Sequence, residues 1–419
     1  MLPPSSQPGQ VLGGFYFFLS FSLLAVKLPM LTFRSYCRVA DIIPPMPDPL
    51  PNPLYELHEK AGAEFQSYAE LPIVSTFGEP QAEYAAIHKG AALMDQPFRG
   101  FLELTGKDRH VFLNNLITNQ VWDKEKKTGL AAGQGAYAFF LNTKGRVIAD
   151  MNVLENGESL LLEMDARHVE PTRIAFEKFR FAEQVTIENE IGKRYQLAVH
   201  GPSAGQVLGL AEPLDPMQSR AVRLLDNDAI IWRDDPTGHP GYQIIVKTSN
   251  APGIWTKLLE AFGQATGIGK RPLRPIGWAA FNATRIEAGR PLFGIDFDET
   301  VLPAETAQLS RAVSFTKGCY LGQEVVARMH ARNVVARQIV GIRMNDDSLP
   351  IAGSHIFAPD GSGNQIGGIT SSTVSPVLSN ASICLGIVKK AYTDPGSIVE
   401  IPAEGAMRKG TVVATPFAK

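Results

Sequence analysis

From residue 53 onward, apolar residues recur at spacings that switch between those of helices and those of strands. The stretch LYELHEKAGAEF (54–65) has an apolar or small residue at every third or fourth position, which predicts a helix that includes Phe65. YAAIHKGAALMD (84–95) predicts a second short helix that ends at Gly90. The folded part of the chain is therefore expected to begin with helical segments.

Alternation of apolar and polar residues then indicates paired strands. Two such runs, 136–141 and 147–154, flank a turn at 142–145 and predict a hairpin. ESLLLEMD (158–165) predicts a third strand, and HVEPTRIAFEKFRF (168–181) predicts a helix after it. Hairpins that alternate with helices are typical of an α+β fold.

A similar order of elements follows. YQLAVHG (195–201), AIIWRD (229–234) and YQIIVK (242–247) predict strands, and 253–266 and 276–289 predict helices. The repeated order predicts two related α+β lobes, although the two sequences are too dissimilar to establish an internal repeat.

Short strands separated by Gly, Pro, Asn and Asp fill the chain beyond Arg337 and predict a small β-barrel. The predicted domains are a leader (1–52), a first α+β lobe (53–194), a second α+β lobe (195–336) and a C-terminal β-barrel (337–419).

The leader is expected to be disordered or absent from the mature chain, because PPMPDPLPNP (44–53) has Pro at nearly every second position. The apolar run at 11–26 is shorter than the roughly 20 residues of a spanning helix. No Lys or Arg precedes this run, unlike in a secretory signal. A start at Met30 or Met46 predicts a cytoplasmic protein. The alternative is a transit peptide for the mitochondrial matrix, since residues 1–40 lack Asp and Glu.

Composition excludes several classes of function. A net charge of -2 and a pI of about 6.5 give no general attraction for DNA or for an anionic membrane. Three cysteines without a CxxC pair exclude a disulfide framework and the usual structural zinc sites. HxxxH, HExxH, GxGxxG and P-loop spacings are absent from the sequence, so neither a metal nor a nucleotide is predicted.

Cys319 is the most distinctive candidate for chemistry, because it lies in the octapeptide KGCYLGQE (317–324). A helix predicted to begin at Gln323 directs its first N–H groups toward this turn, and Lys317 lies two residues away. Both favour a thiolate, which is nucleophilic, redox-active or able to bind a soft metal. The alternative is a small apolar filler in a turn that requires its glycines.

Several stretches of the chain resemble the folate-binding aminomethyltransferase superfamily, whose founder is the T-protein of the glycine cleavage system. They are PLYELHEKAGA (53–63), TGKDRHVFLNNLITNQV (105–121), LNTKGRVIADMNV (141–153), RIEAGRPLFGIDFDETVLPAET (285–306) and GGITSSTVSPVL (367–378). Within that superfamily, KGCYLGQE resembles the signature of the YgfZ branch, a folate-binding group implicated in iron-sulfur enzyme maintenance.

The resemblance implies two α+β lobes that hold tetrahydrofolate, or a folate derivative, in a central channel closed on one side by the barrel. It also implies iron-sulfur assembly proteins or their clients as partners, and we expect a monomer. A single thiol cannot hold a whole cluster, which generally needs four ligands. Any role in the assembly or repair of iron-sulfur clusters would therefore be transient, through a partner, or would depend on folate chemistry.

The chain departs from the transferase pattern at two places. A pair of aspartates in the transferase corresponds here to Ala149 and Asp150, so one acid is missing. A stretch with two glutamates in the transferase reads TGHPGYQ here, with His239 and Gln243 at the two positions. These departures put the glycine-cleavage reaction itself in doubt.

The remaining site predictions follow from the implied folate. Asp150 shares a strand face with Asn152 and could hold a proton for the pterin N5 atom. Arg285 is expected to keep its guanidinium unengaged and, like Arg233, to grip the carboxylates of the glutamate tail. The other predicted folate contacts are Tyr242, Tyr320, Gln323 and Arg328.

Three hypotheses result. The first is a folate-binding protein that assists iron-sulfur proteins through Cys319. The second is a tetrahydrofolate-dependent one-carbon transferase that uses Asp150. The third is a scaffold that has lost its folate.

Overall fold

The computed structural model describes residues 50, 52–264, 272–332 and 335–417. The predictions about the leader concern residues 1–52, so they lie almost entirely outside the described residues. Among the described residues, every helix falls short of the length and apolar character needed to cross a membrane. Residues Pro44–Lys419 form one compact unit.

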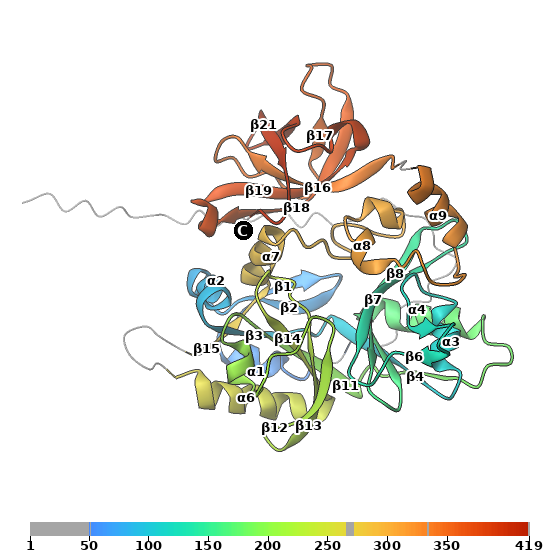
Figure 1. Ribbon diagram of the computed structural model, residues 1–419. Helices are drawn as coiled ribbons and strands as arrows, with labels where there is room; N and C mark the ends of the chain where they lie inside the picture. The colour runs from blue at the N-terminus through green and yellow to red at the C-terminus, as the bar shows by residue number, and fades with distance from the viewer. Residues whose placement is uncertain (1–49, 51, 265–271, 333–334, 418–419) are drawn as a thin grey trace, which may run out of the picture. The chain divides into compact units, whose positions relative to one another are not determined.

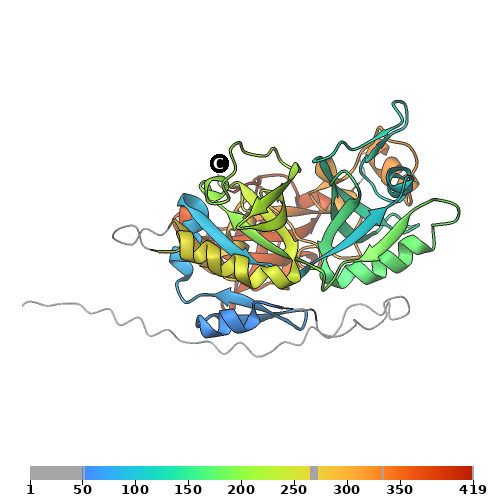
Figure 2. The same cartoon turned by 90° about the horizontal axis from the view of Figure 1, so that it is seen from below.

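The first sheet has five strands among the described residues, all antiparallel to their neighbours. Its strands, in spatial order, are β10 (Thr186–Asn189), β4 (Arg99–Thr105), β9 (Leu160–Asp165), β8 (Val147–Glu155) and β7 (Gly135–Leu141). The predicted hairpin is confirmed as β7 and β8. Helix α4 (Ala166–Glu177) covers one face of this sheet and buries Val169 and Phe176 in its core (Figure 2).

The second sheet has six strands among the described residues. In spatial order they are β12 (Ser219–Leu224), β13 (Asn227–Arg233), β14 (Gly241–Lys247), β11 (Arg194–His200), β3 (Ala91–Asp95) and β15 (Leu273–Ile276). Only the pair of β15 and β3 is parallel within this sheet. Helix α6 (Ala251–Phe262) packs on it through Ile254 and Leu258 (Figure 2).

The C-terminal strands close into a barrel, which confirms the predicted third part of the fold. Around the barrel they run β16 (Arg337–Met344), β19 (Ala381–Lys389), β18 (Gln365–Ser375), β17 (His355–Phe357), β20 (Ile398–Ala403) and β21 (Ala406–Val413). Helix α7 (Trp278–Glu287) packs against β18 and β19 and also against α2 (Pro80–Lys89), so both of its faces are covered (Figure 1).

Shorter elements complete the described chain. The remaining helices are α1 (Tyr55–Lys60), α3 (Arg109–Asn114), α5 (Ala204–Val207), α8 (Leu309–Ala312) and α9 (Gln323–Arg332). The remaining strands are β1 (Glu64–Tyr68), β2 (Leu71–Thr76), β5 (Trp122–Asp123) and β6 (Thr128–Gly129). The 3₁₀ turns are η1 (Thr248–Asn250), η2 (Pro303–Glu305), η3 (Pro376–Leu378) and η4 (Lys390–Tyr392).

The first predicted helix is wrong in its second half. Gly62 has a φ of +76°, a conformation that favours glycine and ends the helical segment, so Phe65 lies in strand β1. Strand pairing also crosses the predicted boundary at 194/195, because β3 belongs to the sheet of β11. The two-lobed α+β fold with a C-terminal barrel is nevertheless the fold predicted.

Candidate functional site

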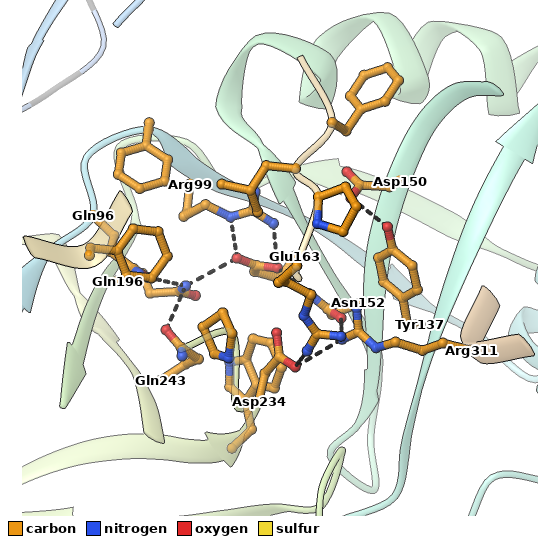
Figure 3. Close-up of a pocket in the computed structure, with 18 of the residues that line it drawn as sticks. Gln96, Arg99, Tyr137, Asp150, Asn152, Glu163, Gln196, Asp234, Gln243 and Arg311 are labelled. Atoms are coloured by element: carbon orange, nitrogen blue, oxygen red, sulfur yellow. Dashed lines mark hydrogen bonds and ion pairs between the residues drawn. The ribbon is translucent and has the colours of Figure 1, made fainter. Parts of the chain in front are cut away.

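A cavity lies where side chains of the two sheets face each other (Figure 3). Its space, together with the solvent at its mouth, is about 670 Å³. The first sheet contributes Arg99, Tyr137, Asp150, Asn152 and Glu163 to the wall. The second sheet contributes Gln196, Trp232 and Gln243. Side chains of a strand point alternately to its two faces, so every second residue of these strands points to the cavity. The residues between them fill the hydrophobic cores of the two sheets.

Asp150 is the carboxyl group in this wall that is suited to hold a proton. It accepts a hydrogen bond from the Tyr137 hydroxyl at 2.8 Å. Burial raises the pKa of Asp150, and the positive charge of Arg99 only partly opposes this effect. Asp150 therefore stays protonated at a pH at which a surface aspartate is ionised.

Glu163 is, by contrast, fully engaged. Arg99 pairs with both of its oxygens. Asn152 Nδ2 and Gln196 Nε2 also donate to Glu163, at 2.8 Å and 3.0 Å. The positive charge of Arg99 compensates the glutamate, and the hydrogen bonds fix the side chains around it.

A third ionic group closes another side of the cavity. Asp234 pairs with Arg290 and with Arg311, whose Nη2 lies 2.9 Å from Asp234 Oδ1. Burial alone would raise the pKa of Asp234, but the two guanidinium groups hold it below its usual value. The Arg311 guanidinium also lies 4.0 Å above the centre of the Tyr137 ring. The wall thus carries two cations around one carboxylate.

Two buried polar atoms of the wall have no partner among the described residues, namely Trp232 Nε1 and Gln196 Oε1. Trp232 is only 1% exposed. Buried polar atoms nearly always find a hydrogen-bond partner, so these two atoms are exceptions beside the cavity.

Asp150 and Asn152 both lie in the cavity wall, and their roles toward folate stay predictions. The prediction for Arg285 is wrong. Its side chain is 0% exposed and pairs with the equally buried Asp296, while Nη2 donates to Ser371 Oγ at 2.6 Å. Helix α7 is covered on both faces, so this guanidinium is not available to a ligand.

Arg233 and Tyr242 also lie away from the cavity. Arg233 pairs with Asp235 and donates to the carbonyl of Leu214 at 2.7 Å. Tyr242 is buried in the core of the second sheet, on the face of β14 opposite to Gln243. Neither residue lines this cavity, and their predicted folate contacts stay predictions.

The KGCYLGQE segment lies outside the described wall of the cavity. Lys317 is buried, and its Nζ donates to the carbonyls of residues 114, 117 and 119 at 2.6, 2.6 and 2.9 Å. Burial lowers the pKa of Lys317 to about 7. The described contacts join Lys317 Nζ to these carbonyls and not to Cys319, and its effect on the thiol stays a prediction.

The other residues of the segment face different surroundings. Cys319 is exposed. Tyr320 is buried in an apolar cluster, and burial raises its pKa to about 12. Gln323 begins helix α9, as predicted, and Arg328 is exposed on that helix. The cavity wall described here includes none of the predicted folate contacts Tyr320, Gln323 and Arg328.

Sequence reasoning missed most of the polar wall. The residues missed are Gln96, Arg99, Tyr137, Glu163, Gln196, Trp232, Asp234, Arg290 and Arg311. Strand register could have found some of them, because Tyr137 and Glu163 are both direct cross-strand partners of Asn152. The residues of the second sheet carried no such signal, since nothing in the sequence shows which faces of the two sheets meet.

Comparison with known proteins agrees with this architecture. The GCVT N-terminal domain family matches residues 54–317, and the glycine cleavage T-protein C-terminal barrel domain family matches residues 337–419. The chain is 28% identical to an aminomethyltransferase of Bacillus subtilis (strain 168) over 377 residues, which cover 88% of this chain and 98% of that protein. It is 30% identical over 382 residues to an aminomethyltransferase of Geobacillus sp. (strain WCH70), with coverage of 88% and 98%.

A solved structure shows the same fold. The glycine cleavage system aminomethyltransferase T from Bartonella henselae superposes with a TM-score of 0.76 at 26% identity, covering 88% of this chain and 97% of that one. The match thus extends over both lobes and the barrel. The chain belongs to the aminomethyltransferase superfamily of the glycine cleavage T-protein.

Proposed function

We propose that this protein binds tetrahydrofolate in the cavity between the two sheets and catalyses a one-carbon transfer of the aminomethyltransferase class, with Asp150 as its acid. The observation that carries the proposal is the buried carboxyl of Asp150, which lies in the cavity wall, accepts from Tyr137 and has its pKa raised by burial. The names of the relatives support the reaction class.

Tetrahydrofolate would supply the nitrogen that accepts the one-carbon unit. Asp150 would hold a proton for transfer near that nitrogen, a task that suits a carboxyl group whose pKa is raised by burial. Gln196 and Trp232 would orient the ring through their unpaired polar atoms. Arg290 and Arg311, which together face one carboxylate, leave positive charge for the glutamate tail.

The test compares wild type with Asp150→Asn by titration calorimetry and by methylene transfer to tetrahydrofolate. Loss of one general acid reduces a rate by about 10²–10⁴-fold, so D150N should bind tetrahydrofolate but lose turnover to this extent. Wild-type activity should fall as pH rises through the raised pKa, because the protonated form acts, and D150N should lack this limb.

Asp360→Asn is the matched control, since Asp360 is exposed on the barrel. D150N with wild-type turnover contradicts the role of Asp150. Wild type that binds neither tetrahydrofolate nor formyl-tetrahydrofolate contradicts the whole proposal and favours the folate-free scaffold.

A second candidate function is assistance to iron-sulfur proteins in the manner of the YgfZ branch. The observation that favours it is the exposure of Cys319 outside the folate cavity, where a partner protein can reach the sulfur. In cells, Cys319→Ser should then lower the activity of iron-sulfur enzymes while leaving tetrahydrofolate binding unchanged. Intact iron-sulfur enzymes in the C319S strain would remove this candidate.

A further inference from the structure

Three glutamines meet in the cavity wall on the side of the second sheet (Figure 3). Gln196 lies on β11 and Gln243 on the adjacent strand β14, while Gln96 directly follows β3, the neighbour of β11 on its other side. Gln96 is 4% exposed and Gln243 is 3% exposed, so both side chains are buried except for what the cavity reaches. The proposed function gives these two residues no role.

Gln196 fixes the orientation of the other two amides. Its Nε2 donates to Glu163 Oε1 at 3.0 Å, because a carboxylate paired with Arg99 only accepts. The same nitrogen lies 2.7 Å from Gln96 Oε1 and 3.4 Å from Gln243 Oε1 (Figure 3). Turning either amide over would bring two NH₂ groups together, so both oxygens face Gln196. The two NH₂ groups must therefore point away from Gln196.

These two NH₂ groups are donors without an acceptor. Neither Gln96 Nε2 nor Gln243 Nε2 has a hydrogen-bond partner among the described residues, and both nitrogens remain accessible from the cavity. Donors on side chains that are this deeply buried nearly always find an acceptor. A carbonyl oxygen of a bound molecule is a suitable acceptor, since it can accept two hydrogen bonds.

The nearby carboxylates do not supply that acceptor. Glu163 already accepts from three side chains. Asp234 pairs with Arg290 and with Arg311. This part of the wall therefore offers N–H donors to a ligand, and it suits a ligand edge that accepts hydrogen bonds.

The donor character of Gln243 departs from the transferase pattern, which has a glutamate at this position. An ionised glutamate only accepts, so it suits a ring N–H group. The Gln243 amide turns its NH₂ group to the cavity instead. The substitution thus exchanges an acceptor for a donor, and it reverses the kind of ligand atom that this position binds.

We propose that Gln96 and Gln243 are specificity-determining residues that donate to the carbonyl oxygen at C4 of the pterin ring. The inference rests on the proposed function, because it names the part of folate that this wall recognises. The carboxylates of the glutamate tail are assigned to Arg290 and Arg311, so the C4 oxygen is the carbonyl left to the ring. An amino group at C4 would place N–H groups against two buried donors, and the wall should reject it.

The experiment compares tetrahydrofolate with its 4-amino analogue, in which an amino group replaces the C4 oxygen. Titration calorimetry on the full chain, at a pH at which both rings are neutral, gives the ratio of the two dissociation constants. Wild type should bind tetrahydrofolate about 10–100-fold more tightly than the analogue, the cost of leaving buried donors unpaired.

Two variants test the assignment to these residues. Gln243→Glu restores an acceptor, so it should shift the ratio toward the 4-amino analogue at least about tenfold. Gln96→Met removes one donor and adds no acceptor, so it should weaken tetrahydrofolate binding more than binding of the analogue. Gln365→Glu, the same change at an exposed position of barrel strand β18, is the matched control and should leave the ratio unchanged.

The ratio separates this inference from a structural role, because a merely distorted cavity weakens both ligands alike. Equal affinity of wild type for the two ligands would overturn the inference and leave the proposed function standing. An unchanged ratio in Q243E would also overturn it, and the wild-type ratio decides the matter even if Q243E does not fold. Wild type that binds neither ligand would overturn the proposed function and this inference with it.

Discussion

Replacement of Arg285 by methionine should destabilise the protein without removing a ligand contact. The guanidinium is 0% exposed and joins helix α7 to Asp296 and to Ser371 of the barrel. Methionine fills a similar volume but cannot donate a hydrogen bond, so R285M leaves the Asp296 carboxylate buried without its cation. Water cannot stabilise the negative charge of Asp296 in this variant, because the Asp296 side chain is itself 0% exposed.

The size of the loss in stability follows from this buried, unpaired carboxylate. Breaking a buried ion pair by removing one partner costs about 3–5 kcal/mol. The unfolding entropy is about 2.1 cal/mol/K per residue. If Pro44–Lys419 unfolds in one step, this entropy converts the loss of stability into a fall in Tm of about 4–6 °C. Asp296→Asn in the R285M background should recover part of the loss, because it removes the uncompensated charge.

The assays are denaturant unfolding at fixed pH and thermal unfolding by calorimetry. Arg223→Met is the matched control, since Arg223 pairs with Asp228 at the surface, where both side chains are more than half exposed. A surface pair contributes about 0–1 kcal/mol. If R285M keeps the wild-type Tm and instead loses tetrahydrofolate binding, the residue is a tail ligand as the sequence suggested, and the structural argument is refuted.

Two other predictions concern the KGCYLGQE segment. Lys317→Met should change the pH dependence of the free energy of unfolding. Lys317 has a pKa of about 7 in the folded chain, so the unfolded chain binds more protons than the folded chain between about pH 7 and 10. The wild-type protein therefore becomes more stable as the pH rises through this range. Denaturant unfolding across this range should show a slope for wild type up to about 1.4 kcal/mol per pH unit steeper than for K317M, and equal slopes would contradict the burial argument. Cys319 should react with iodoacetamide in the native protein, whereas Cys384, buried and with its pKa raised to about 12, should react only on unfolding. Peptide mapping by mass spectrometry checks this, with C319S as the control, and native labelling of Cys384 would contradict it.

Local patterns predicted the hairpin of β7 and β8 and the strands of the barrel, because each depends on neighbours in the sequence. The helix α7 was also predicted, but the fate of Arg285 was not. The spacing of apolar residues in the sequence shows which face of a helix is buried. The other face of α7 is covered by the barrel, whose strands lie far along the chain and leave no local signal in the helix sequence.

The alternation of side chains along strand β14 explains the position of Tyr242. Neighbouring residues on β14 point to opposite sides, so Gln243 in the cavity wall requires Tyr242 in the core. Of the two substituted positions in the TGHPGYQ stretch, Gln243 lines the cavity between the two sheets and His239 does not. His239 lines a different cavity, together with His88 and Glu287, and no spacing in the sequence indicates this.

The geometry also divides the KGCYLGQE segment into residues that packing explains and one that it does not. Gly322 has a φ of +79°, and a Cβ there would lie 2.6 Å from the carbonyl oxygen of Asn142, so only glycine allows this close approach to the β7–β8 turn. Lys317 ties the segment to three carbonyls of the first lobe, and the Tyr320 ring is buried below its ammonium at 5.1 Å. Cys319 makes no such contribution, since its side chain is exposed and serine would satisfy the backbone equally. A fixed segment that presents an exposed thiol is what a reaction with a partner protein requires, and for this reason Cys319 must be tested by its chemistry and not by its effect on stability.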